Sequence, residues 1–337
     1  MRRREFIMLI AGAAAQGHRL AARAQQPSKM KRVAMVHPAT KPADMRIGGD
    51  PNYAIIFEEM KRLGYVEGTN LIVDRYSAEG RFDRFPEIAR DVVATRPDVI
   101  LAIGSTVGVI APFLSETRTI PIVAWTGDLV TAGIISSLAR PAGNITGVST
   151  DAGPELGAKR MQLFVEAVGK LSNVRYLGTP AEWEVPWTKF AREAARRMNI
   201  PLRLEPLHAP INEAEYRRAF DSMQRDHVDG VVISGLAENY TNRVLLGRLA
   251  QEYRLPATCA YSESADAGAL MSYAFNLETV DRRVAGQIVE ILNGGNPAEM
   301  PFFQETHWDL TINLKAAKEL GLEVPARLVA QAERVIE

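Results

Sequence analysis

The stretch DVILAIGSTVGVIAP, residues 98–112, decides the fold class of this 337-residue chain. Its first half is a short apolar run, as expected of a strand that is buried on both faces of a sheet. Its second half is another apolar stretch of helical length, and Gly104-Ser105-Thr106 forms the turn between the two. A buried strand that leads directly into a helix is typical of a parallel sheet covered by helices.

The same alternation of strand and helix continues along the chain from about residue 30. Short β-rich runs alternate with helical patterns of ten to fifteen residues, which predicts βαβ units and parallel sheets. Around ten such strands are too many for one compact unit of this kind. We therefore predict an α/β protein with two Rossmann-like lobes. Strands are expected at 31–37, 69–78, 98–104, 120–125, 144–150, 173–179, 201–207, 228–235, 256–261 and 267–275.

Three segments are expected to cross between the lobes and to form a three-strand hinge. They are the Pro- and Gly-containing stretch 137–150, the stretch 273–278, and the extended run within 294–314. This pattern assigns residues 30–147 plus 275–305 to lobe 1 and residues 148–274 plus 306–337 to lobe 2.

The first 24 residues have the order of a secretory signal peptide. Arg2, Arg3 and Arg4 precede an apolar run, and Ala22-Arg23-Ala24 offers a small-x-small cleavage site. The apolar run is about half of the roughly 20 residues that a transmembrane helix needs. The Arg3-Arg4 pair also resembles the twin-arginine export signal, which leaves two export routes open. The alternative is a basic, disordered start of a cytoplasmic protein. We predict export to the periplasm.

Composition and missing motifs exclude several classes of function. The 40 Lys and Arg residues balance the 40 Asp and Glu residues, so no basic excess points to nucleic acid. No dinucleotide fingerprint, P-loop, nucleophile elbow or metal-spaced histidine pair occurs. The one cysteine, Cys259, rules out an intramolecular disulfide and fits an inert core position. We expect a monomer that is not an enzyme and that needs neither cofactor nor metal.

Candidate ligand-binding residues follow from the direction of the predicted strands. In an open parallel sheet, ligands bind outside the carboxyl ends of the strands. The rule selects residues that directly follow a strand, without any catalytic motif. The candidates are His37, Gly104, Ser105, Thr106, Trp125, Thr126 and Asp128 in the first lobe, and Trp183, Ser234, Tyr261, Glu263 and Tyr273 in the second.

The turn at Gly104-Ser105-Thr106 has two interpretations. Ser105 or Thr106 can cap the helix that follows, because their side-chain oxygens accept from its first N–H groups. The same hydroxyls and N–H groups can instead hold a carboxylate or phosphate. The turn lacks the lysine of a P-loop and the glycine of a nucleophile elbow, so nucleotide binding and nucleophilic catalysis are not predicted.

The aromatic and acidic candidates also have two interpretations each. Trp125 stacks on an aromatic or apolar ligand or packs in the core. Asp128 accepts from a ligand amine or caps a helix. Trp183 belongs to a ligand lid or packs on the following helix. Tyr261 and Glu263 bind a ligand amine or lie in a solvated loop.

Nearly the whole chain resembles a known family. The matching stretches are 2–7, 20–27, 63–93, 119–149, 156–168 and 282–337. They resemble the type I periplasmic solute-binding proteins of ABC transporters, and more narrowly the substrate-binding family that includes tryptophan- and tyrosine-type binders. The resemblance implies two lobes that close on a small solute, delivery to an ABC permease in the inner membrane, and no catalysis. The chain departs from the family's usual pattern at three places: the turn at 104–107, Trp125 and the stretch 178–190.

The predicted function is that of an extracytoplasmic solute-binding protein of an ABC importer. Its ligand is predicted to be a small carboxylate-bearing or aromatic solute, such as an amino acid. Two alternatives are a binding protein that presents its ligand to a sensor, and a two-lobed α/β enzyme. A regulator of the repressor type would need a helix-turn-helix where this chain has its signal-like segment.

Overall fold

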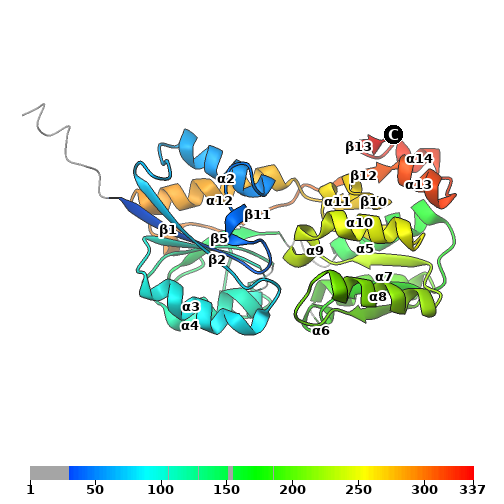
Figure 1. The fold of residues 1–337 in the computed structure, drawn as a ribbon, viewed down its shortest axis with the longest axis horizontal. Helices are drawn as coiled ribbons and strands as arrows, with labels where there is room; N and C mark the ends of the chain where they lie inside the picture. The colour runs from blue at the N-terminus through cyan, green and yellow to red at the C-terminus, as the bar shows by residue number, and fades with distance from the viewer. Residues whose placement is uncertain (1–29, 105, 128, 151–154, 185) are drawn as a thin grey trace, which may run out of the picture.

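The protein is built around two separate sheets (Figure 1). A computed structural model describes residues 30–337, apart from residues 105, 128, 151–154 and 185. The predicted signal peptide, residues 1–24, lies outside the described residues. The first sheet has six strands in the order β11-β5-β4-β3-β1-β2, and the second has seven in the order β13-β12-β10-β9-β8-β6-β7.

The first sheet is parallel throughout and is covered on both faces. Helices α2 and α12 pack on one face, and α3 and α4 pack on the other (Figure 1). Its strands carry near-continuous runs of buried residues, as the sequence predicts for strands covered on both sides. The strands are β1 (Lys31–His37), β2 (Leu71–Ser77), β3 (Val99–Ile103), β4 (Ile122–Thr126), β5 (Ile145–Ser149) and β11 (Phe303–Gln304), and the helices are α2 (Pro51–Arg62), α3 (Phe85–Ala94), α4 (Ala111–Glu116) and α12 (Leu277–Leu292).

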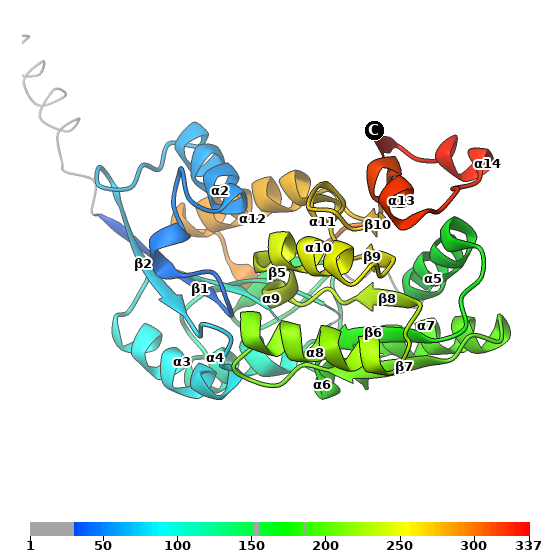
Figure 2. The same ribbon diagram turned by 45° about the vertical axis from the view of Figure 1, so that its right-hand side comes forward.

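The second sheet repeats this arrangement. Helices α8 (Glu213–Arg225) and α10 (Arg243–Glu252) contribute to the apolar core on one face. Helices α5 (Glu155–Val168) and α7 (Pro186–Arg197) lie with the other core, and Figure 2 shows α10 in front of the strands. Its strands are β6 (Val174–Gly178), β7 (Leu202–Pro206), β8 (Gly230–Ile233), β9 (Ala257–Cys259), β10 (Met271–Ala274), β12 (Asp309–Asn313) and β13 (Arg334–Ile336).

The chain passes three times from one sheet to the other. It leaves the first sheet after β5, returns after β10, and leaves again between β11 and β12. Figure 1 shows the result, because the orange helix α12 lies with the blue and cyan elements of the first lobe. The first passage follows β5, so the predicted lobe boundary between residues 147 and 148 falls inside that strand.

One pair of strands departs from the predicted all-parallel arrangement. Strand β12 is antiparallel to β10, whereas the other pairs in the second sheet are parallel. The cause is the route of the chain. Strand β10 ends where the chain leaves for the first lobe, and β12 begins where the chain comes back from it, so the two strands run in opposite directions.

The segment after β3 is not the single regular helix that the sequence predicts after the turn at residues 104–106. A π-helical stretch, Thr106–Ile110, precedes the short helix α4. Pro112 has no N–H to donate to a carbonyl in the preceding turn, and proline is tolerated only in the first turn of an α-helix. The regular α-helix therefore begins at Ala111, directly before this proline.

Several short elements have no counterpart in the sequence prediction. They are α6 (Pro180–Trp183), α9 (Ala237–Thr241), α11 (Ser262–Asp266) and β13, and the C-terminal helical segment consists of α13 (Leu314–Leu320) and α14 (Ala326–Val329). They are too short to show a clear periodicity. In α10, Leu249 is fully buried whereas Val244 is 69% exposed.

Candidate functional site

A cavity of about 870 Å³ lies between the two sheets. It is bordered by residues that follow β1, β3, β4 and β5 in the first lobe, and β6, β8 and β9 in the second. The carboxyl ends of both sheets thus face one space, as the rule for open parallel sheets requires. Five of the predicted residues line it: His37, Gly104, Trp125, Thr126 and Tyr261.

His37 lines the first-lobe side of the cavity as a neutral side chain. Its Nδ1 accepts from the backbone N–H groups of Ala39, at 3.0 Å, and Thr40, at 2.8 Å. Burial lowers the pKa of His37 to about 3. The imidazole is therefore uncharged at physiological pH, and its structural role is to hold the turn that follows β1.

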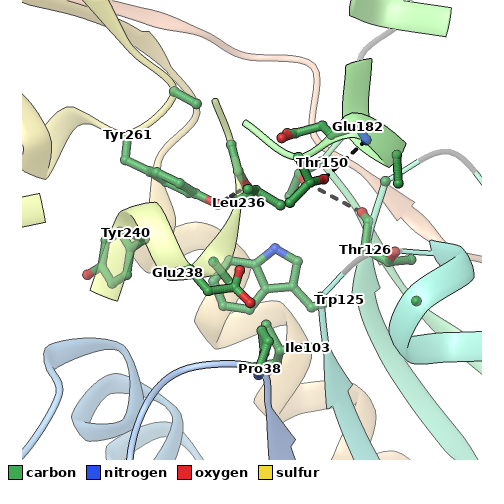
Figure 3. Close-up of a pocket in the computed structure, with 18 of the residues that line it drawn as sticks. Pro38, Ile103, Trp125, Thr126, Thr150, Glu182, Leu236, Glu238, Tyr240 and Tyr261 are labelled. Carbon is green, nitrogen blue, oxygen red and sulfur yellow. Dashed lines mark hydrogen bonds between the residues drawn. The ribbon is translucent and has the colours of Figure 1, made fainter. Parts of the chain in front are cut away.

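Trp125 and Gly104 lie on neighbouring strand ends of the first lobe. The N–H of Gly104 donates to the Trp125 carbonyl at 3.0 Å. Gly104 has φ +138°, and a side chain there would meet Val109 at 2.6 Å, so only glycine fits this turn. Trp125 is 8% exposed, and Figure 3 shows its indole at the cavity wall beside Ile103.

Arg160, from helix α5, brings a positive charge to the second-lobe wall. Its Nε and Nη2 donate to the Tyr273 carbonyl at 3.2 and 2.9 Å. Burial lowers the pKa of this guanidinium. No carboxylate of the described residues lies within 4.0 Å of it. Among the described residues, its hydrogen bonds go to this one backbone carbonyl, so the guanidinium keeps donors for an anionic group.

Two carboxyl groups of the second lobe line the same cavity. Glu182 lies on α6, and burial raises its pKa to about 7, with nearby Glu238 contributing in the same direction. Glu238 lies on α9 and is 1% exposed, and burial raises its pKa to about 7 as well. One side-chain oxygen of Glu182 and both of Glu238 have no hydrogen-bond partner in the described part of the chain.

Aromatic rings provide much of the remaining lining. Tyr240 and Tyr261 meet edge to face with their centroids 5.0 Å apart, and Tyr261 meets Phe275 at 6.0 Å. Trp308 follows at 5.3 Å from Phe275, and its indole N–H is buried without a partner among the described residues. Trp125 packs in the same apolar cluster. The cavity is thus mostly apolar, with a few charged or polar groups at defined places, as is typical of sites for small ligands.

The two lobes touch beside this cavity. The Tyr240 hydroxyl donates to Oδ1 of Asn52 at 3.1 Å, and the hydroxyls of Thr40 and Thr241 lie 3.2 Å apart. The backbone N–H of Ile211 reaches the carbonyl of the first-lobe residue 80 at 3.4 Å. These contacts join residues that are 130 or more positions apart in the chain, so they hold one particular placement of the lobes.

Other predicted residues do not line the cavity. The Trp183 ring packs on Tyr176 with centroids 5.6 Å apart, and the Arg192 guanidinium lies 4.6 Å from its centroid. Ser234 is buried, and its hydroxyl accepts from the Asn239 side chain at 2.9 Å. Glu263 and Tyr273 lie outside the lining as well. Ser105 and Asp128 lie outside the described residues, as does the side chain of Thr106.

Arg160 and Glu238 are two charged lining residues that the strand-end rule misses. Both lie on helices, and the rule selects only residues that directly follow a strand. Glu238 lies only five residues after the end of β8, in the first turn of α9. A rule that also includes the first turn of the following helix selects it. Glu182 lies four residues after the end of β6, close enough to the strand end for the rule to select it. No local signal marks Arg160, which lies in the second turn of an amphipathic helix.

The described residues contain no metal-ligand cluster and no helix that could cross a membrane. No group of three or more His, Cys, Asp or Glu side chains in these residues is arranged to hold a metal ion. None of the helices described is both long and apolar enough to cross a membrane. The Cys259 thiol is buried, and burial raises its pKa to about 12, which agrees with the predicted inert core position.

Solved structures identify the fold as that of the type I periplasmic binding proteins. A conserved domain protein from Vibrio cholerae is 24% identical, with a TM-score of 0.78, over 91% of this chain and 100% of that one. An ABC domain in complex with L-Trp from Streptococcus pneumoniae is 19% identical, with a TM-score of 0.75 and the same coverage.

The family follows from the sequence comparison. Residues 48–336 match the family described as ABC transporter substrate binding protein, which is most of the chain. The chain belongs to this family of solute-binding proteins. It is also similar to a protein named tyrosine-binding protein from Clostridioides difficile, with 21% identity over 273 residues that cover 77% of this chain and 73% of the relative.

Proposed function

We propose that this protein is the extracytoplasmic binding component of an ABC importer. It binds one small organic solute between its lobes and delivers it to a permease in the inner membrane. Residues 1–24 direct export, residues 30–149 plus 275–305 form lobe 1, and residues 150–274 plus 306–337 form lobe 2, with the first predicted boundary moved to the end of β5. The protein acts as a monomer, without catalysis or cofactor.

The observation that carries this proposal is the shared cavity of about 870 Å³, because both lobes contribute its walls. A solute in this space contacts both lobes only when they are together. It therefore favours the closed arrangement by its difference in affinity for the two forms. The three passages of the chain between the sheets supply the hinge.

The lining favours a solute with a carboxylate and an apolar or aromatic part. Arg160 supplies a cation for the carboxylate, in addition to the predicted contacts of Ser105 and Thr106. Trp125, Tyr240 and Tyr261 supply apolar surface. Relatives named for tyrosine and crystallised with L-Trp support an amino acid or an aromatic acid.

Native mass spectrometry of the purified protein, followed by calorimetric titration, tests this function. Amino acids, aromatic acids and neutral sugars are the solutes to titrate. The substitution Arg160→Gln should weaken carboxylate binding by about 10- to 100-fold, because a hydrogen bond to a charged group is lost. Arg90→Gln, which removes an exposed charge on α3, is the matched control. Stabilisation by neutral sugars alone would contradict the carboxylate, and binding of no solute would contradict the function.

A further inference from the structure

Glu238 is a buried carboxyl group that lacks a partner. Its side chain is 1% exposed, and neither of its oxygens has a hydrogen-bond partner in the described part of the chain. Figure 3 shows this carboxyl pointing into the cavity, toward the wall that carries Trp125 and Ile103. Buried carboxyl groups are almost always paired or hydrogen-bonded, because leaving one unpaired is costly. The missing partner is therefore expected to arrive from the cavity.

No cation of the described residues is in place to neutralise Glu238. Lys189 and Arg160 also line the cavity, yet neither is within the 4.0 Å of an ion pair with it. The titratable groups that interact with Glu238 are Glu182, Tyr216 and Tyr261, which are neutral or acidic. The surroundings of Glu238 thus have a deficit of positive charge.

The neighbouring walls suit an organic cation. Trp125 and Tyr240 belong to one apolar cluster, against which Tyr261 packs, and all three line the cavity. Aromatic faces attract ammonium groups, most strongly where water is excluded. A carboxylate that shares a cavity with aromatic rings therefore favours a compact positive group with several N–H donors over a neutral hydroxyl.

We propose that Glu238 binds an ammonium group of the transported solute, so that the ligand class is amines and, together with Arg160, zwitterionic amino acids. This inference rests on the proposed solute-binding function. It assigns the two charged ends of the solute to two elements of the same lobe, α9 and α5. Glu182 faces the same space and adds negative charge beside the ammonium.

Matched solutes test the inference. Each series keeps one side chain and removes either the carboxylate or the amine. The first series is L-tyrosine, tyramine and 3-(4-hydroxyphenyl)propionate, and the second is L-tryptophan, tryptamine and indole-3-propionate. An aliphatic pair, L-leucine and 4-methylpentanoate, lacks the aromatic ring. Titration calorimetry with wild-type protein should show that each deaminated acid binds about 10- to 100-fold more weakly than its amine-bearing counterpart.

The variant Glu238→Gln should abolish this preference without lowering the thermal stability of the fold. Glu323→Gln removes an exposed carboxyl of the second lobe and should keep the preference. If deaminated acids bind wild-type protein as tightly as amines, or if Glu238→Gln weakens both equally, the ammonium site is wrong while solute binding stands. Binding of sugars alone leads to the same conclusion. If no compound of any class binds, the proposed function fails together with the inference.

Discussion

Replacing Glu238 with Gln should stabilise the ligand-free protein at pH 8 and change it little at pH 5. Burial raises the pKa of this carboxyl to about 7 in the folded protein, whereas its ordinary value is 4.5. Between these values the folded protein keeps a proton that the unfolded chain has released. The folded state thus binds more protons, so its stability falls as the pH rises.

The size of the effect follows from the pKa difference. At about 1.4 kcal/mol per pKa unit, ionising Glu238 costs the folded state about 3 kcal/mol above pH 7. Below the unfolded pKa of 4.5 this penalty is absent, because both states are protonated. Glutamine has the same shape and no charge, so the variant avoids the penalty. For a chain of this length, the gain corresponds to a rise in Tm of about 5 °C at pH 8.

Thermal unfolding followed by circular dichroism at pH 5, 6, 7 and 8 measures this difference. The gap in Tm between the variant and wild type should open between pH 5 and 8. Glu323→Gln, which removes an exposed carboxyl of the second lobe, is the matched control and should not reproduce this gap. A constant gap for Glu238→Gln across the whole range would refute the reasoning, since it would mean that this carboxyl is not protonated preferentially in the folded state.

Three further predictions concern binding and packing. The affinity of wild-type protein for amine solutes should rise between pH 6 and 8, because binding requires ionised Glu238. Isothermal titration calorimetry at constant ionic strength measures this affinity, and an affinity that does not change with pH would contradict the prediction. Glu182 titrates in the same range, whereas His37 does not. Thr241→Val removes the hydroxyl contact with Thr40 between the lobes, so the closed form should be less populated. Solute binding should weaken by about 2- to 10-fold, without loss of Tm. An unchanged affinity in calorimetry would contradict a role of this contact in lobe closure. Gly147→Ala should destabilise the protein by about 3 kcal/mol or more in chemical unfolding, because φ is +151° and the new Cβ would lie 1.9 Å from the Ala124 carbonyl oxygen; Gly286→Ala, in an open helix position, should not destabilise it, and equal effects would contradict the steric reason.

The residues at the strand ends are the part of the candidate site that could be predicted from the sequence. Burial on both faces of a strand is recorded in its own residues, so the strands and their carboxyl ends could be predicted locally. His37, Gly104, Trp125, Thr126 and Tyr261 therefore reach the cavity as expected. Trp183 does not, because its ring packs against Tyr176 and Arg192 on its own lobe. Nothing in the local pattern distinguishes that packing from a role in binding.

The sequence by itself determined the alternation of strands and helices, the two lobes and the edge of each sheet where a ligand would bind. These properties depend on periodicity and chain direction, which neighbouring residues carry. Only the tertiary structure decided which side chains complete the cavity. Arg160 and Glu238 lie on helices, and whether a helical residue faces the solvent or the cavity depends on the placement of the whole helix and of the opposite lobe. That placement results from contacts between residues far apart in the chain, such as Tyr240 with Asn52.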